Sequence, residues 1–399
     1  MEKRRLFYVF GAILGILIFI LAVIFGTKKP VNQKKPNEVV EEKPIILFGT
    51  LENEKLQPLI SAFSPYGKLN YFYFDEKEIY SKFLESIAKN EYPDALLISD
   101  KIFNSFQDKI TPFFPSANLD IFDFLKETYT KEGYLLAYPI FVDPIFFVAN
   151  KKFFLSLGIL KLPQTFDELN ELIQYIKSQI KERIKEIGVI NLGTISNNDF
   201  IIEILTFFAL NFGAESKDIF SNYPDAWSKS LNYYFSFSDD QSPNYSFNET
   251  FPPVIESLAQ EKLITAFVTY SSLDKIKKIN PDIEFLISSL PVKDILKRKS
   301  LFNTYLLILP KVSKNQEGVK RFLSFIYNFP EKVVETGFLP SRRGNYNLNE
   351  INDLFFREIL VGKTILWPPK DLIEDAIFKA KVELSYNKNV GNLFIENFK

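Results

Sequence analysis

The sequence predicts an α/β protein with two similar units, preceded by a single membrane helix. Short apolar runs alternate with helical patterns after residue 44, and this alternation occurs in two successive segments. A 21-residue stretch without a charge, Leu6 to Gly26, lies near the N-terminus. Hydrophobic residues make up 46% of the 399 residues and the net charge is −1, which is typical of a chain with a large packed core.

The composition excludes several kinds of site. The chain contains no His and no Cys. This rules out Ser-His-Asp and Cys-His nucleophile systems, zinc sites built on these residues, disulfides and lipid attachment through Cys. Near-neutral charge argues against nucleic acid as a partner, because phosphate binding requires clustered Lys and Arg. We therefore expect neither a metal nor another cofactor.

The N-terminal segment is typical of an uncleaved membrane anchor. About 20 apolar residues span a bilayer as a helix, whereas the apolar part of a signal peptide is shorter, roughly 7–15 residues. Lys3, Arg4 and Arg5 favour a cytoplasmic N-terminus, although Lys28 and Lys29 follow on the other side. The prediction is a cytoplasmic stub (1–5), a transmembrane anchor (6–26), a flexible tether (27–43) and an extracytoplasmic remainder.

The first α/β unit follows the tether. Apolar runs at 45–48, 69–74 and 94–99 predict strands, and helical spacing of apolar residues separates them. Strands that alternate with helices in this rhythm indicate a parallel sheet.

The second unit contains the clearest helical pattern, "PQTFDELNELIQYIKSQIKERIKEIG". Thr165 and Glu168 predict a capping box at its start, and Gly188 is its expected end. A strand at 189–192, a helix ending at Gly213 and strands at 266–270, 284–290 and 305–309 follow. Ser313 and Gln316 predict a second capping box.

Several segments, taken in order, resemble the extracellular solute-binding proteins of ABC transporters, in the family that includes maltose-binding protein. The block "LLAYPIFVDPIFFVANKKFFLSLGILKLPQTFDELNELIQYI" is similar to the family's most recognisable region, with Ala149 where a tyrosine is usual. "ESLAQEKLITAFVTYS" and "TGFLPSRRG" resemble two further family segments, with Glu261 where Gly is usual. The likeness covers roughly residues 44 to 360.

The resemblance implies a two-lobed periplasmic-binding-protein-like fold (type II), hinged by crossing strands. The implied lobes are 44–142 plus 271–308 and 143–270 plus 309–399. The chain would cross between them near Phe141–Asp143, near Tyr270–Ser272 and near Leu309–Val312. Family members are commonly tethered through an N-terminal Cys, so the membrane helix would take over that role here.

Candidate ligand-binding residues follow from the rule that ligands bind at the carboxyl ends of sheet strands, here facing an interlobe cleft. Asp143 stands at the first crossing, where the resemblance implies a polar ligand contact. For each of these residues a structural role in a turn, a cap or the hinge is the alternative. The full set is Gly49, Thr50, Ser99, Asp100, Asp143, Thr194, Ser196, Asn197, Thr269, Tyr270 and Ser271.

The resemblance implies binding without chemistry. The expected function is capture of a small solute, with a carbohydrate as the leading candidate, and its delivery to ABC permease subunits by hinge closure. Two alternatives stay open: an extracellular binding or sensing module without transport, and a glycosidase that uses two carboxylates. No carboxylate pair in the sequence supports the glycosidase in particular.

Overall fold

The structure is a computed structural model that describes residues 43–112, 120–183, 186–344, 348, 351–386 and 389–398. Within these residues no helix is both long and apolar enough to cross a membrane. The predicted stub, anchor and tether (1–43) lie outside this range except for Lys43. Residues 43–399 form one compact unit.

A single mixed sheet runs through this unit in the order β2-β1-β3-β10-β6-β8-β7. β1 (Ile45–Gly49) pairs in parallel with β2 (Leu69–Tyr73) and β3 (Ala95–Ser99), as the strand-helix alternation predicted. β10 (Ser300–Ile308) and β6 (Tyr138–Asn150) are antiparallel to their neighbours at the centre, so the sheet is only partly parallel.

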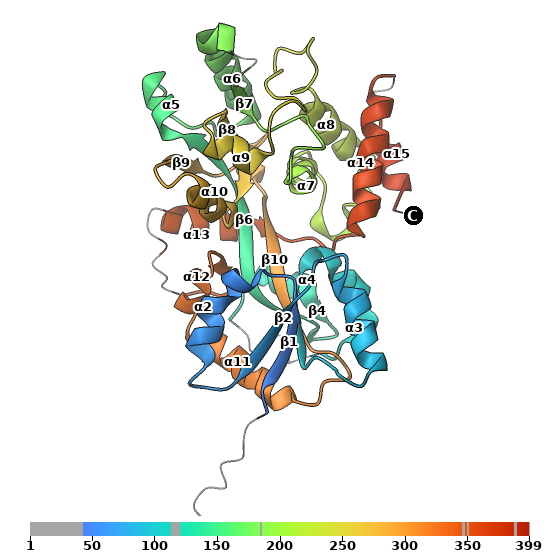
Figure 1. Cartoon of the computed structure of the whole chain (residues 1–399). Helices are drawn as coiled ribbons and strands as arrows, with labels where there is room; N and C mark the ends of the chain where they lie inside the picture. Colours follow the sequence, from blue (N-terminus) through green and yellow to red (C-terminus); the bar gives the residue numbers. More distant parts are fainter. Residues whose placement is uncertain are drawn as a thin grey trace, which may run out of the picture. The chain divides into compact units, whose positions relative to one another are not determined.

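Two hydrophobic cores lie along this sheet, and we call the parts that pack around them the first and the second lobe. The first core takes residues from 45–142 and 302–355, together with Phe146. Besides β1, β2 and β3, its elements are α2 (Asn53–Phe63), α3 (Ile79–Ala88), the 3₁₀ helix η1 (Asp100–Lys109), α4 (Asp123–Tyr129), β4 (Thr130–Lys131), β5 (Tyr134–Leu135), α11 (Gln316–Asn328), α12 (Glu331–Val334), β11 (Leu339–Pro340) and α13 (Asn352–Leu360). In Figure 1 α2, α3, α4 and α11 lie around β1 and β2, and α13 lies nearer to β6.

The second core takes residues from 145–301 and 365–395. Its strands are β7 (Gly188–Ile190), β8 (Leu263–Thr269), β9 (Phe285–Ser288) and β12 (Gly362–Lys363). Its helices are α5 (Lys151–Ser156), α6 (Phe166–Ile180), η3 (Lys181–Arg183), α7 (Ile201–Asn211), η4 (Ser216–Asp218), α8 (Pro224–Phe235), α9 (Val254–Ala259), α10 (Ser272–Ile279), η5 (Ile295–Lys297), α14 (Lys370–Leu384) and α15 (Gly391–Glu396).

The strands β6 and β10 connect the two lobes, and Figure 1 shows both running from one lobe into the other. All 13 residues of β6 are buried. The first crossing lies near Asp143, which pairs with Asn303 of β10. Leu301 belongs to the second core and Phe302 to the first, so β10 itself makes the next crossing.

This distribution differs from the expected lobe boundaries. Residues 273–301 pack on the second core, not the first, and residues 309–355 pack on the first core, not the second. The reason is that α10 and β9 stay beside β8 and β6, so the chain crosses at β10 and returns between α13 and α14.

Of three helix termini predicted from the sequence, one is confirmed and two are wrong. The capping box of Thr165 and Glu168 is confirmed. The predicted helix end at Gly188 is wrong, because α6 ends at Ile180 and Gly188 begins β7. The predicted cap at Ser313 is also wrong, because Asn315 accepts the hydrogen bond from Gly318 N at 3.1 Å.

Candidate functional site

A cavity of about 670 Å³ lies between the two lobes. Its first-lobe wall is formed where β1, β2 and β3 end, with Thr50 after β1, Tyr73 at the end of β2 and the segment 75–78 after it, and Lys101 after β3. Because these strands are parallel, their carboxyl ends meet at one edge and place all three segments on the same wall.

The second lobe supplies the opposite wall. Ser271 and Lys275 come from the start of α10, and Pro369, Lys370 and Asp371 from the start of α14. Three aromatic rings also line the cavity: Tyr73, Tyr305 and Phe338. Tyr305 and Phe338 pack edge to face with ring centroids 5.1 Å apart, which fixes the orientation of both rings.

Ion pairs cross the cavity from lobe to lobe. Lys55 Nζ of α2, which is only 7% exposed, lies 2.8 Å from Asp274 Oδ2 of α10. Lys275 Nζ lies 3.3 Å from Glu52 Oε1. Lys101 pairs with Glu203 of α7, which is 3% exposed. Since both members of the Lys101–Glu203 pair are largely shielded from water, separation of the lobes would leave Glu203 without its cation.

Asp143, the predicted contact at the first crossing, holds the hinge together. Its carboxylate accepts hydrogen bonds from Ser271 N at 2.8 Å and from Ser271 Oγ at 2.6 Å. Burial raises the pKa of Asp143 to about 6, and the hydrogen bonds from Ser271 oppose this shift. The acid in the middle of an apolar strand therefore attaches β6 to the turn between β8 and α10.

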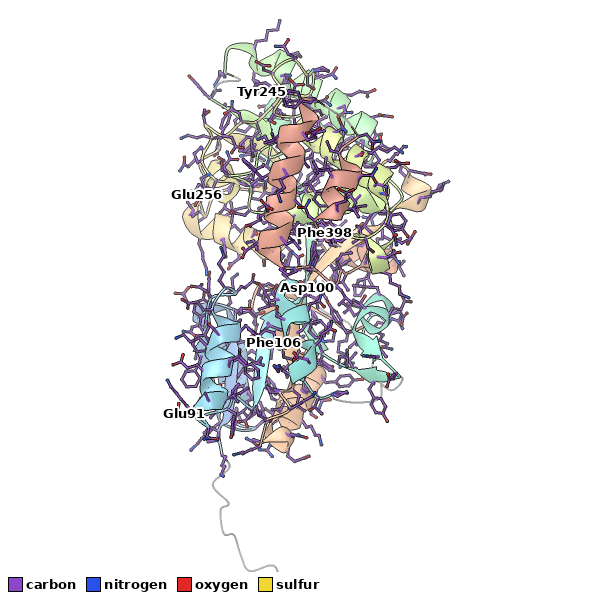
Figure 2. The ribbon with its side chains drawn as sticks, turned by 90° about the vertical axis from the view of Figure 1, so that its right-hand side faces the viewer. Glu91, Asp100, Phe106, Tyr245, Glu256 and Phe398 are labelled. Carbon is purple, nitrogen blue, oxygen red and sulfur yellow. The ribbon has the colours of Figure 1, made fainter. Side chains whose placement is uncertain are left out.

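Asp100 is fully buried and joins both lobes to the crossing strand. Its Oδ2 accepts hydrogen bonds from Thr304 N at 3.0 Å and from Thr364 Oγ1 at 3.2 Å. Burial raises its pKa to about 8, with the charge of Lys101 opposing the shift. Figure 2 shows Asp100 at the level where the two lobes meet.

The other residues near the strand ends of the first lobe are structural. Ser99 accepts a hydrogen bond from Lys101 N at 3.1 Å and so caps η1. A Cβ at Gly49 would lie 2.7 Å from the Tyr71 hydroxyl, so this glycine allows close packing of β2 on β1. Only Thr50 of this predicted group lines the cavity.

The predicted loop of the second lobe does not reach the cavity. Tyr234 donates to the carbonyl of Thr194 at 2.6 Å, and Glu249 accepts hydrogen bonds from the backbone and hydroxyl of Ser196. Asn197 Nδ2 donates to the carbonyls of Asn248 and Phe251, at 3.0 Å each. These contacts fix the loop against its own lobe.

The three predicted residues around the start of α10 have different surroundings. Ser271 lines the cavity between the lobes, whereas Thr269 bonds to Ser272 Oγ at 2.7 Å and is buried. Tyr270 borders a second cavity, of about 750 Å³, and packs edge to face on Phe146. Of the predicted set, then, the structure brings Thr50 and Ser271 to the cavity between the lobes.

Sequence reasoning missed most of the cavity wall. Tyr73 ends β2 and the segment 75–78 follows it, so the strand-end rule applied to the second strand would have found them. Lys55, Tyr305 and Phe338 carry no such signal, because they lie within a helix, within a strand and beside a short strand. In the part of the chain that the structure describes, no group of acidic residues is arranged to hold a metal ion.

More than half of the chain matches a known protein family. The family model described as "Bacterial extracellular solute-binding protein" matches residues 78–328. No curated protein matches the chain in sequence.

Among solved structures, an ABC transporter solute-binding protein from Thermotoga lettingae bound with α-D-tagatose has a TM-score of 0.68 at 18% identity. The match covers 89% of this chain and 98% of that one. A cyclic α-maltosyl-1,6-maltose binding protein from Arthrobacter globiformis reaches 0.70 at 14% identity, with 89% and 98% coverage. An ABC substrate-binding protein from Listeria monocytogenes, in complex with cycloalternan, reaches 0.70 at 11%, with 89% and 97% coverage. At these identities the likeness concerns the fold.

Proposed function

Because the chain belongs to the bacterial extracellular solute-binding proteins, we propose that it is a receptor that captures a carbohydrate between its lobes and delivers it to the permease of an ABC transporter. The observation that carries this proposal is the interlobe cavity of about 670 Å³, which combines aromatic rings with many polar side chains. Rings cover the apolar faces of a sugar, and polar side chains take its hydroxyls.

The charge balance of the cavity supports a neutral solute. Five lysines (Lys55, Lys77, Lys101, Lys275 and Lys370) face five acids (Glu52, Asp75, Glu76, Glu78 and Asp371). A site for phosphate or for a polyamine would need an excess of one sign. The titles of the structures compared above, which name sugars as the ligands of those proteins, point in the same direction.

The proposed mechanism is hinge closure about β6 and β10. The first lobe would comprise 43–142 and 302–360, and the second 145–301 and 362–398, as the packing of the two cores suggests. A solute that contacts both walls binds the closed arrangement more tightly and shifts the population toward it. Catalysis is not part of the proposal, since the family is one of binding proteins.

The N-terminal segment supports a membrane-tethered, extracytoplasmic receptor. Residues 6–26 would anchor the chain in the lipid bilayer with residues 1–5 in the cytoplasm, and residues 27–43 would let the lobes reach the permease. Fractionation of cells expressing the full chain would test this, because loss of residues 6–26 should release the protein from the membrane.

Binding is tested with the full chain purified in a mild detergent. We expect one or more members of a panel of mono- and oligosaccharides to raise the melting temperature. Ligand at 100 times its Kd adds about 2.7 kcal/mol to the free energy of unfolding. Amino acids, polyamines and phosphate serve as comparison solutes. No response to any sugar, together with a response to one of these solutes, would refute the carbohydrate assignment.

A matched pair of tyrosines locates the binding site. Tyr73 lines the cavity and is 40% exposed, and Tyr134 is 52% exposed on β5, away from the cavity. Tyr73→Ala should weaken sugar binding, measured by calorimetry, and Tyr134→Ala should leave it unchanged. Equal effects of both substitutions would contradict binding in this cavity.

A further inference from the structure

The polar groups of the cavity that lack partners all belong to the first lobe. Thr50 Oγ1 is buried and has no hydrogen-bond partner. Glu76 and Tyr305 line the cavity, and neither side chain has a hydrogen bond or ion pair within the residues that the structure describes. A buried hydroxyl without a partner costs roughly 1–3 kcal/mol, so Thr50 Oγ1 favours a polar ligand. Glu76 and Tyr305 offer further polar groups on the same wall.

The negative charge of Glu76 acts on the other side chains of this wall. Burial is the main cause of the raised pKa of Tyr305, and Glu76 adds to it. The pKa of Lys101 is raised by Glu203 and then by Glu76, against the effect of burial. Glu76, Tyr305 and Lys101 all line the cavity, so the charge of Glu76 acts within one wall.

The polar side chains of the second-lobe wall already have protein partners. Ser271 Oγ donates to Asp143, and Lys275 pairs with Glu52. Lys370 Nζ lies 3.6 Å from Glu374, and Asp371 lies 3.9 Å from Lys77 of the first lobe. The charged groups of this wall therefore bond to protein, in part across the cavity.

We propose that solute selectivity resides in the first lobe, in Thr50, Glu76 and Tyr305, and that the second lobe closes over the solute through ion pairs with the first. The closing pairs are Lys55–Asp274, Glu52–Lys275 and Lys101–Glu203. A carboxylate accepts hydrogen bonds from two vicinal hydroxyls, and the Thr and Tyr hydroxyls each donate and accept. This inference rests on the proposed function, since it names the residues by which the same cavity distinguishes one polyhydroxylated solute from another.

The first test compares variants of the two walls. Glu76→Gln should weaken binding of the preferred sugar about 10-fold, and Thr50→Val and Tyr305→Phe should each weaken it about 3- to 10-fold. All three should change the ranking of epimeric sugars in the panel, measured by calorimetry. Lys370→Gln and Asp371→Asn remove charges from the opposite wall and should preserve that ranking.

The closing pairs are tested by Asp274→Asn. Loss of this partner lowers the population of the closed form, so the affinities of all sugars should fall by the same factor. The chain has no Cys, so spin labels attach only at introduced Ser81→Cys (α3) and Glu374→Cys (α14). Without solute, 1 M NaCl and Asp274→Asn should each lengthen the measured distance between the labels.

The outcomes distinguish failure of the proposed function from failure of the inference about selectivity. If the chain binds no sugar, the proposed function and this inference both fail. If it binds sugars, but their ranking follows Lys370 and Asp371 and not Thr50, Glu76 and Tyr305, only the inference fails. An interlabel distance that does not respond to salt or to Asp274→Asn would refute closure through ion pairs.

Discussion

The buried carboxylate of Asp143 makes the stability of the protein depend on pH. In the folded state its pKa is about 6, compared with the ordinary 3.8, because burial disfavours the charged form. Between these values the folded chain keeps a proton that the unfolded chain has released. The contribution of Asp143 to the free energy of unfolding is therefore highest below about pH 4, falls as the pH rises toward 6, and stays low above it.

The magnitude follows from the difference between about 6 and 3.8. At about 1.4 kcal/mol for each unit of pKa, ionisation of Asp143 reduces the free energy of unfolding by about 3 kcal/mol. Asp143→Asn imitates the protonated form, since its oxygen can still accept from Ser271 N. The variant should match the wild type near pH 4 and exceed its stability by up to about 3 kcal/mol at pH 8.

Urea unfolding of both proteins at several pH values between 4 and 8 measures this difference. Other titrating groups contribute equally to both proteins, so the difference isolates Asp143. Ser271→Ala is the control: it removes the donor to Oδ2 and should raise the pKa of Asp143 further, which deepens the loss of stability with pH. A difference between Asp143→Asn and the wild type that is the same at every pH would refute the reasoning.

Three further substitutions have defined outcomes. Asp100→Asn should stabilise the protein increasingly from about pH 4 to about pH 8 and by a constant amount above that, because burial raises the pKa of Asp100 from 3.8 to about 8; an effect of the same size at pH 4 and pH 8 would contradict this. Thr165→Ala removes the capping box of α6 and should cost about 1 kcal/mol in urea unfolding, more than Thr128→Ala in the last turn of α4. Gly49→Ala brings a Cβ within 2.8 Å of the Leu97 carbonyl of β3 and should cost about 1–3 kcal/mol; a neutral result would mean that β1 and β3 can move apart.

The strands of the fold could be predicted because they are short apolar runs with clear boundaries. Residues 45–48 and 94–99 correspond to β1 and β3 within one residue at either end. The lobe assignment could not be derived in the same way. β10 is apolar on both faces over most of its length, and nothing in such a run says at which residue it leaves one core for the other.

The candidate site was predictable as an edge of the sheet but not residue by residue. Thr50 and Ser99 both follow parallel strands, yet only Thr50 faces the cavity, since Ser99 turns back to cap η1. Asp143 was correctly singled out as unusual, but its partner Ser271 is 128 residues away in sequence. Only the folded arrangement of β6 and α10 shows that the pair belongs to the hinge.

The continuity of β6 has a consequence for how the protein unfolds. Its residues 138–144 pair with β10 and its residues 145–150 pair with β8 and β9, so one strand supplies hydrogen bonds to both lobes. Melting of either lobe would strip a central strand from the other. We therefore expect the described lobes to lose structure in one cooperative calorimetric transition, with no intermediate in which a single lobe survives.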